Sequence, residues 1–321
     1  MKRFIIMIVA VLAVSVLWMA AWFYVAGRIE AEIAVFAQAD GVTQPRLECA
    51  DLSVGGAPFS FTPRCRTATI TAADTTVTLD AITGTALFYR PFHIQLFATG
   101  PARITDAFTG ASQEVTWSNL HASVRLGGGS LERFSAVADD LVYSDTLMGQ
   151  TELGTAGHAE AHLIDATPAD PQPGTGRIYD FYTAFEDLQS VPLDIANGTV
   201  TLDGQLSGLP EPVLWSDPLV LAYWQALGGQ LTLRGLEASA DGLALSAIGE
   251  AGLTENGLVE GTLEIESEGV TGRIAALADD SVAQIVLGSP NAEGVSTQRL
   301  TINDGTVVVG ILPVAALPPL F

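Results

Sequence analysis

The hydrophobic pattern of the chain begins with an uncharged apolar run from Phe4 to Val25. As a helix its 22 residues would span about 33 Å, enough to cross a hydrocarbon core of about 30 Å. Lys2 and Arg3 precede the run, so the positive-inside rule keeps the N-terminus in the cytoplasm. We predict a transmembrane signal anchor over residues 1–28, with anchoring side chains at Phe4, Ile5, Leu12, Leu17, Trp18, Trp22, Phe23 and Tyr24.

The alternative is a secretory signal peptide that is removed. Such a peptide has a shorter apolar region, of about 7–15 residues, and ends in a small-residue cleavage site. Here Ala20 and Ala21 are followed by further bulky apolar residues. The pattern favours an uncleaved anchor, and therefore a protein that crosses the inner membrane once and has its bulk in the periplasm.

After the anchor, residues 29–39 keep helical spacing and predict that the helix continues as far as Gly41. From Leu47 the apolar positions change to period two, which is the signature of strands. Short runs bounded by Gly, Pro, Asp or Asn predict an antiparallel meander over the N-terminal half, residues 29–165. The runs are residues 68–71, 75–79, 92–97, 102–105, 114–117 and 122–126.

Residues 166–176 (ATPADPQPGTG) predict a loop or a seam between two halves. In the C-terminal half, 177–321, the apolar spacing predicts a helix over 177–188, with Ile178, Phe181, Phe185 and Leu188 on one stripe. A second helix is predicted from Asp217 to Gly228, because an Asp cap, an early proline and a closing glycine frame it.

The last third alternates apolar and polar residues around hairpin signals at Asp241-Gly242 and Asn256-Gly257. Helices are predicted over 270–277 and 282–287, and a final hairpin over 300–309. The fold class is mainly β (β-rich α+β): a long twisted antiparallel sheet, forming a curved half-pipe or groove, with a few short packed helices. Its apolar face must be buried by folding over, by a helix, or by lipid.

The composition argues against two kinds of anionic partner. The chain has 36 acidic and 14 basic residues, and without Lys2, Arg3 and Arg28 the exported part carries about −25. Binding nucleic acid or anionic lipid head groups requires a positive surface, so we expect the exported part to repel both and predict no nucleic-acid partner. Acidity also keeps an apolar-rich exported chain soluble, and this is the simpler explanation.

The two cysteines, Cys49 and Cys65, lie on either side of a Gly-Gly-Ala-Pro turn signal. A hairpin centred on Ala57 would place Cys49 opposite Cys65 and Ser53 opposite Phe61, within reach of a disulfide. No histidine lies within 25 positions of either cysteine, and the C-x-x-C spacing of redox pairs is absent. Outside the cytoplasm we therefore predict a structural disulfide rather than a metal or redox site.

Candidate chemistry is sparse. His158, Glu160 and His162 would share one face of a strand and offer zinc ligands, but no fourth ligand is recognisable and an exposed polar face gives the same pattern. Asp139-Asp140 and Asp279-Asp280 are interpreted as solvated turns or caps, and Gly127-Gly128-Gly129 and Tyr89-Arg90-Pro91-Phe92 as turns. Because H-E-x-x-H, G-x-S-x-G, P-loop and dinucleotide motifs are lacking, we predict no catalytic residue, no cofactor and no metal.

The transmembrane start, the paired-cysteine hairpin with its Gly56-Ala57-Pro58-Phe59 turn, and strands of the form G-x-L-x-L resemble the alphaproteobacterial domain of unknown function 2125. The C-terminal stretch LTINDGTVVVGILPVAALPPL is also similar to that group and, more distantly, to AsmA-like proteins. The first group has no assigned activity. The AsmA-like resemblance implies an inner-membrane-anchored, groove-forming β-sheet protein involved in phospholipid movement and outer-membrane homeostasis.

The predicted function is therefore a non-catalytic envelope protein that binds or guides lipid acyl chains. Its partners would be the inner membrane, phospholipid or other acyl chains, and envelope proteins. One alternative is a scaffold with a closed core whose acidic outside meets a basic partner. The other is an unrecognised hydrolase, against which the missing motifs argue.

Overall fold

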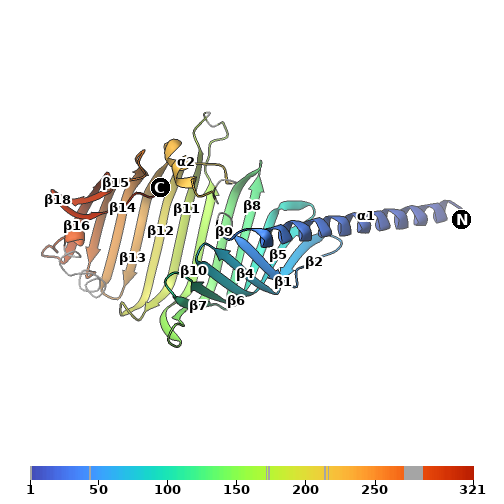
Figure 1. The fold of residues 1–321 in the computed structure, drawn as a ribbon, viewed down its shortest axis with the longest axis horizontal. Helices are drawn as coiled ribbons and strands as arrows, with labels where there is room; N and C mark the ends of the chain where they lie inside the picture. The colour runs from blue at the N-terminus through green and yellow to red at the C-terminus, as the bar shows by residue number, and fades with distance from the viewer. Residues whose placement is uncertain are drawn as a thin grey trace. The chain divides into compact units, whose positions relative to one another are not determined.

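The computed structural model describes residues 2–42, 45–170, 172, 174–212, 215, 217–270 and 285–321. Over these residues the fold is mainly β, with eighteen strands of a long antiparallel sheet, a few short helical segments and one long apolar N-terminal helix (Figure 1). The mainly-β prediction is confirmed. The chain divides into two compact units, described separately below: residues 1–112 with 121–125, and residues 113–120 with 126–321.

The first unit starts with α1 (Lys2–Val35), which the short 3₁₀ helix η1 (Phe36–Gln38) extends. The predicted continuation of the helix beyond the apolar run is therefore confirmed. The strands of this unit are β1 (Arg46–Ala50), β2 (Ser53–Gly55), β3 (Ser60–Cys65), β4 (Thr67–Ala72), β5 (Thr75–Leu87), β6 (Arg90–Asp106) and the middle of β8 (Asn119–Gly127).

β5 is the central strand of this unit and pairs with β3, β4 and β6. β1 adds to β4, β2 adds to β3, and the middle of β8 pairs with β6. Threonine and β-branched residues dominate β4 and β5, as expected of side chains that pack well on a pleated surface. Both strands enclose the predicted 68–71 and 75–79 runs, but β5 is 13 residues long.

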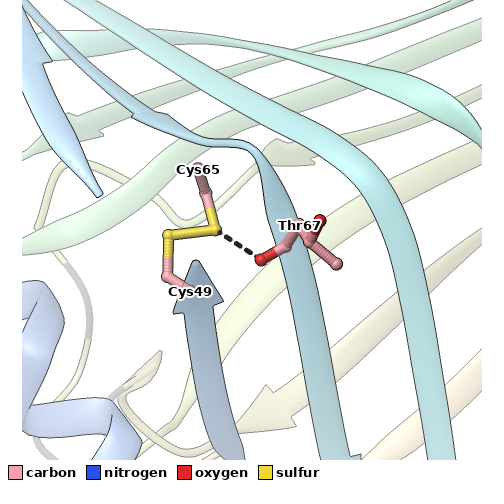
Figure 2. Close-up of a disulfide and its surroundings, with 3 residues drawn as sticks. All are labelled: Cys49, Cys65 and Thr67. Carbon is pink, nitrogen blue, oxygen red and sulfur yellow. Dashed lines mark hydrogen bonds between the residues drawn. A yellow bond between two sulfur atoms is a disulfide. The ribbon is translucent and has the colours of Figure 1, made fainter. Parts of the chain in front are cut away.

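The disulfide between Cys49 and Cys65 is present, with a Cα–Cα distance of 5.4 Å. Figure 2 shows it joining the end of β1 to the end of β3. The Cys65 Sγ lies 3.2 Å from the carbonyl oxygen of Thr67; a disulfide sulfur carries no hydrogen, so this is a contact rather than a hydrogen bond. The predicted disulfide between Cys49 and Cys65 is therefore confirmed.

The strand pairing predicted around this disulfide is wrong. Cys49 pairs across the ladder with Ala68 on β4, and Ser53 pairs with Arg64 rather than Phe61. The physical reason is a break at Asp51, whose positive φ of 51° ends β1 and offsets β2 from it. The turn after β2 does lie at residues 56–59, as the Gly-Gly-Ala-Pro signal indicates.

The second unit is an ordered antiparallel meander in which each strand from β9 to β18 pairs with the next. β7 (Ser112–Thr116), whose first residue belongs to the first unit, pairs with β9. The other elements are β9 (Ser130–Asp145), β10 (Thr151–Asp165), β11 (Arg177–Ser190), β12 (Ile195–Leu209), α2 (Val220–Ala226), β13 (Gln230–Ala240), β14 (Leu243–Leu253), β15 (Val259–Glu268), β16 (Val295–Asn303), β17 (Thr306–Val309) and β18 (Leu312–Ala316).

The helix predicted over 177–188 is wrong: these residues form β11. The apolar spacing from Phe185 to Leu188 comes from a register shift in the pairing with β12, where Asp187 has a φ of 53°. A bulge adds one residue to a strand, so it turns a period of two into an apparent helical interval.

The predicted hairpin turns of this unit are confirmed. The hairpin turns at Asp241-Gly242 and Asn256-Gly257 separate β13, β14 and β15, and the last hairpin is β16–β17. The second predicted helix is α2, shorter than expected. The helices predicted over 270–277 and 282–287 fall mainly on residues 271–284, which lie outside the described residues. The described part of the 166–176 segment connects β10 to β11 within this unit.

Tyr179 on β11 is the largest fully buried side chain among the described residues. Its hydroxyl donates to the carbonyl oxygen of Leu131 at 3.0 Å, and its ring meets Trp215 edge to face. Burial raises the pKa of the Tyr179 phenol to about 12. The side chain therefore stays neutral and fastens β11 to the start of β9.

Candidate functional site

The registers of the second unit separate its side chains into two faces. Residues directly opposite each other on antiparallel strands project from the same face, so the pairing from β9 to β16 can be followed as rows. One face carries mostly polar side chains. One of its rows is Val137, Glu160, Ala184, Thr201, Glu237, Ser246, Glu266 and Thr297.

The other face is apolar over the same eight strands. One row crosses it from β9 to β16 as Phe134, Leu163, Phe181, Gly204, Leu233, Gly249, Leu263 and Leu300. The row beside it is Ala136, Ala161, Thr183, Leu202, Leu236, Ala247, Ile265 and Gln298. We call this surface of β9–β16 the apolar face.

Glycine at position 204 shapes the middle of the apolar face. A Cβ atom there would collide with the ring of Phe181 on the neighbouring strand. The Phe181 ring therefore lies over the backbone of β12 instead of standing away from it. Because position 204 has no side chain, the Phe181 ring occupies the space between the larger side chains on either side.

Over β13–β16 the apolar face is covered. Ala247, Ile265, Leu287 and Leu300 form a buried cluster there. Val270, Val286 and several leucines of β13–β15 pack against it. This end of the face is a packed core.

Over β9–β12 the same face is only partly covered. Phe134, Leu163, Phe181 and Leu202 are half-buried, the nearby Ala138 is buried but small, and Tyr179 on the same face of β11 is the one large side chain there that is fully buried among the described residues. Large apolar side chains that stay partly accessible on a continuous surface mark a binding surface more often than isolated exposed leucines do.

A cavity of about 200 Å³ opens at one end of the face, where β11–β14 meet the turn after β11. Its walls are apolar and include Leu193, Val200, Leu243 and Leu245. An engineered apolar cavity of about 150 Å³ accepts benzene, so this volume suits several methylene groups or the end of an acyl chain.

The polar face holds the His158-Glu160-His162 triplet, which projects from one side of β10 as predicted. His158 Nδ1 lies 2.7 Å from Asp139 Oδ1 on β9, and His162 Nε2 lies 3.1 Å from Glu160 Oε2. The hydrogen bond to Asp139 raises the pKa of His158. Within the described ranges no group of three or more His, Cys, Asp or Glu side chains is arranged to hold a metal ion.

The two aspartate pairs and the two turn segments named in the sequence analysis lie in different kinds of structure. Asp139 and Asp140 lie inside β9, so their interpretation as a turn or cap is wrong; Ser118 Oγ donates to Asp140 at 2.6 Å. Gly128 and Gly129 form a turn with positive φ before β9, and Phe88-Tyr89 form the turn before β6. Asp279-Asp280 lie outside the described residues.

The predicted anchor helix is long and apolar enough to cross a membrane, a property that signal sequences near an N-terminus share. Seven of its eight predicted anchoring side chains are exposed, but Trp22 is 5% exposed. The Trp22 indole N–H donates to the carbonyl oxygen of Ser60 at 2.9 Å, and its ring stacks on Phe61. Trp18 donates to the carbonyl oxygen of Pro58 at 3.1 Å.

This contact between α1 and the β2–β3 turn was not predicted from the sequence. The signal was present, since Trp18 and Trp22 are four residues apart and therefore on one side of a helix. Gly56 helps to form the receiving turn: it has a φ of 98°, and a Cβ there would clash with Ser60.

Comparison with known proteins gives one family. A model described as an uncharacterized protein conserved in bacteria (DUF2125) matches residues 22–318. The chain belongs to this family. The DUF2125 match starts at the buried Trp22, so it includes the last turns of α1 as well as both units. No curated protein and no solved structure matches the chain.

Proposed function

We propose that the protein is a non-catalytic, membrane-anchored protein of the cell envelope that holds or guides lipid acyl chains on the apolar face of its second unit. The observation that carries the proposal is the half-buried stretch of large apolar side chains on that face over β9–β12, next to an apolar cavity of about 200 Å³. Acyl chains need a continuous dry surface and no specific polar partner.

The dimensions of the apolar face support this proposal. Eight strands spaced about 4.8 Å apart give a surface about 34 Å across. The acyl chains of one leaflet extend about 15 Å, half of a 30 Å hydrocarbon core. The four strands β9–β12 alone are about 14 Å across, close to the length of one such chain, and the whole face is about twice as wide.

The proposed location is the inner membrane, crossed once by α1, with the N-terminus in the cytoplasm and both units in the periplasm. The apolar helix and the Cys49–Cys65 disulfide favour export from the cytoplasm. Retention of α1 is supported by Trp18 and Trp22, because their indoles bond to the folded unit on both sides of the Ala20-Ala21 pair. The AsmA-like relation is part of this proposal.

A scaffold with a closed core is the second candidate. The buried cluster at Ala247, Ile265, Leu287 and Leu300 favours it, since that end of the apolar face is already covered. The two functions differ in what they require of β9–β12: a lipid handler uses this surface, and a scaffold does not.

The test uses the full-length protein in its membrane together with a phospholipid that carries a diazirine in one acyl chain. Leu163→Gln changes the apolar face, and Ile164→Gln is its matched control because the neighbouring side chain projects from the polar face. Ultraviolet labelling is mapped to the peptides of β9–β12 by mass spectrometry. Labelling of α1 is the internal standard.

We expect labelling of the wild-type β9–β12 peptides, with about a tenfold loss in Leu163→Gln, as removing roughly 1.5 kcal/mol of apolar contact predicts. Ile164→Gln should label like the wild type. No labelling of these peptides while α1 is labelled, or equal labelling in both variants, would reject the lipid proposal in favour of the scaffold. Thermal unfolding of both variants checks that neither has lost its fold.

A further inference from the structure

We infer that the β2–β3 and β5–β6 turns of the first unit insert into the outer leaflet of the membrane that α1 crosses. We name these two turns, residues 56–59 and 88–89, the aromatic tip. The inference rests on the proposed function only in that α1 must be a retained membrane anchor. It adds a second membrane-contacting surface, built by the sheet.

The apolar part of α1 that precedes its contact with the sheet is shorter than the membrane is thick. Trp18 is the first residue of α1 that bonds to the sheet, through the carbonyl oxygen of Pro58. The apolar part of α1 before it, Phe4–Leu17, spans only about 21 Å, whereas the hydrocarbon core is about 30 Å thick. A spanning α1 must therefore keep its next turns in the membrane, and these are the turns that contact the aromatic tip.

The aromatic tip has side chains that suit a membrane interface. Phe59 and Tyr89 are each 62% exposed, and Phe88 is 40% exposed although its ring meets Trp18 at 4.9 Å. Phe92, just inside β6, is 66% exposed. Aromatic side chains gather at membrane interfaces, and an exposed cluster of them on a soluble surface is costly.

Acidic residues are absent from the sequence around the aromatic tip. In a chain with 36 acidic residues, none lies between Asp51 and Asp74 or between Asp80 and Asp106. Arg90 is the single Asp, Glu, Lys or Arg among residues 84–95, beside the aromatic tip. Anionic head groups would repel carboxylates and attract an arginine, so this region has the charge that a membrane surface favours.

A cavity of about 430 Å³ lies between α1 and the aromatic tip. Val14, Trp18, Met19, Pro58, Phe59 and Phe88 supply most of its apolar wall. At the depth that the helix length requires, this space faces acyl chains. We therefore assign the occupant of this surface as the lipid bilayer rather than a second protein.

The test places single fluorophores on the full-length chain in phospholipid vesicles. Both native cysteines are in the disulfide, so Phe59→Cys and Tyr89→Cys each add one reactive thiol for an NBD label. Phe108→Cys is the matched control: it is an 85% exposed aromatic of the same unit, next to the opposite end of β5, about 40 Å from the aromatic tip. Leu12→Cys reports on α1 itself.

We expect blue-shifted emission and its loss on adding doxyl-labelled lipid for the labels at positions 12, 59 and 89, but not at 108. Quenching at 12 without quenching at 59 and 89 would overturn the inference and leave the anchor in place. No quenching at 12 would overturn the anchor and the inference together. Disulfide-linked dimers of the unlabelled Phe59→Cys variant that exclude lipid would assign the aromatic tip to a second copy instead.

Discussion

The two units differ sharply in charge. The first unit has eight acidic and nine basic residues, a net charge of +1, whereas the second has 28 acidic and five basic residues, a net charge of −23. The average acidity of the chain therefore describes the second unit alone. A near-neutral unit attached to an apolar helix can approach anionic lipid without the repulsion that the second unit would meet.

The units also differ in what stabilises them. The first has a covalent link between the ends of β1 and β3. The second has no cysteine and relies on the buried cluster over β13–β16 and on Tyr179. The comparison indicates that chemical reduction and core substitutions will act on different halves of the chain.

The largest expected effect separates the units directly. Replacing both Cys49 and Cys65 by Ala should destabilise the first unit by about 3 kcal/mol, because an open loop of this size has more freedom in the unfolded chain. Hydrogen exchange followed by mass spectrometry, in increasing urea, measures each unit by its own peptides. Reduced wild-type protein is the matched control and should behave like the double variant.

The second unit should keep its exchange midpoint in that experiment. If the peptides of β10–β15 lose protection together with those of β3–β5, the two units unfold as one, and the distinction between them is wrong.

A smaller loss of stability, confined to the second unit, is expected from a substitution in β11. Tyr179→Phe should cost the second unit about 1–3 kcal/mol, because it leaves the buried carbonyl oxygen of Leu131 without its donor. Tyr143→Phe is the control, since that side chain is 37% exposed on β9 of the same unit. Urea unfolding followed by unit-specific exchange should show no change in the first unit. Equal effects of the two variants would mean that the hydroxyl of Tyr179 is not an anchor.

The smallest effect concerns pH and again only the second unit. The bond to Asp139 raises the folded-state pKa of His158, so its stabilisation is fully present below the ordinary pKa of about 6.5 and is lost as the pH rises through the folded value. The urea midpoint should therefore be slightly higher at pH 6 than at pH 8. Asp139→Asn should reduce this difference, and Asp140→Asn, whose carboxylate meets Ser118, should not.

An NMR titration of the His158 ring gives the same answer site by site. If the pKa of His158 were the same in Asp139→Asn as in the wild type, the bond between His158 and Asp139 would not be the cause of the pH dependence.

The sequence was sufficient for the fold class because period-two patterns and Gly-containing turns are local signals. β13–β15 and their turns at Asp241-Gly242 and Asn256-Gly257 follow them closely. It was insufficient at irregularities. The bulge near Asp187 imitated a helix in β11, and the break at Asp51 shifted the register next to a correctly predicted disulfide.

The candidate surface needed the structure for a different reason. Each apolar row joins one residue from each of eight strands, and no local pattern gives the register between strands. Phe181 was recognised as apolar, but its position over Gly204 depends on the β11–β12 pairing. The four-residue spacing of Trp18 and Trp22 places both on one side of a helix, but their partners lie about forty positions away and could be found only from the structure.

The last strand has a consequence for how the molecule behaves at high concentration. β18 pairs with β17, and its second residue is Pro313, which has no backbone N–H to offer an incoming strand. The tail beyond it folds back, with Leu317 donating to Gly305 and Leu320 to Gly257. A meander this long, with a final edge strand able to bond along its whole length, would invite copies to stack into filaments, and the proline removes one backbone donor from that strand.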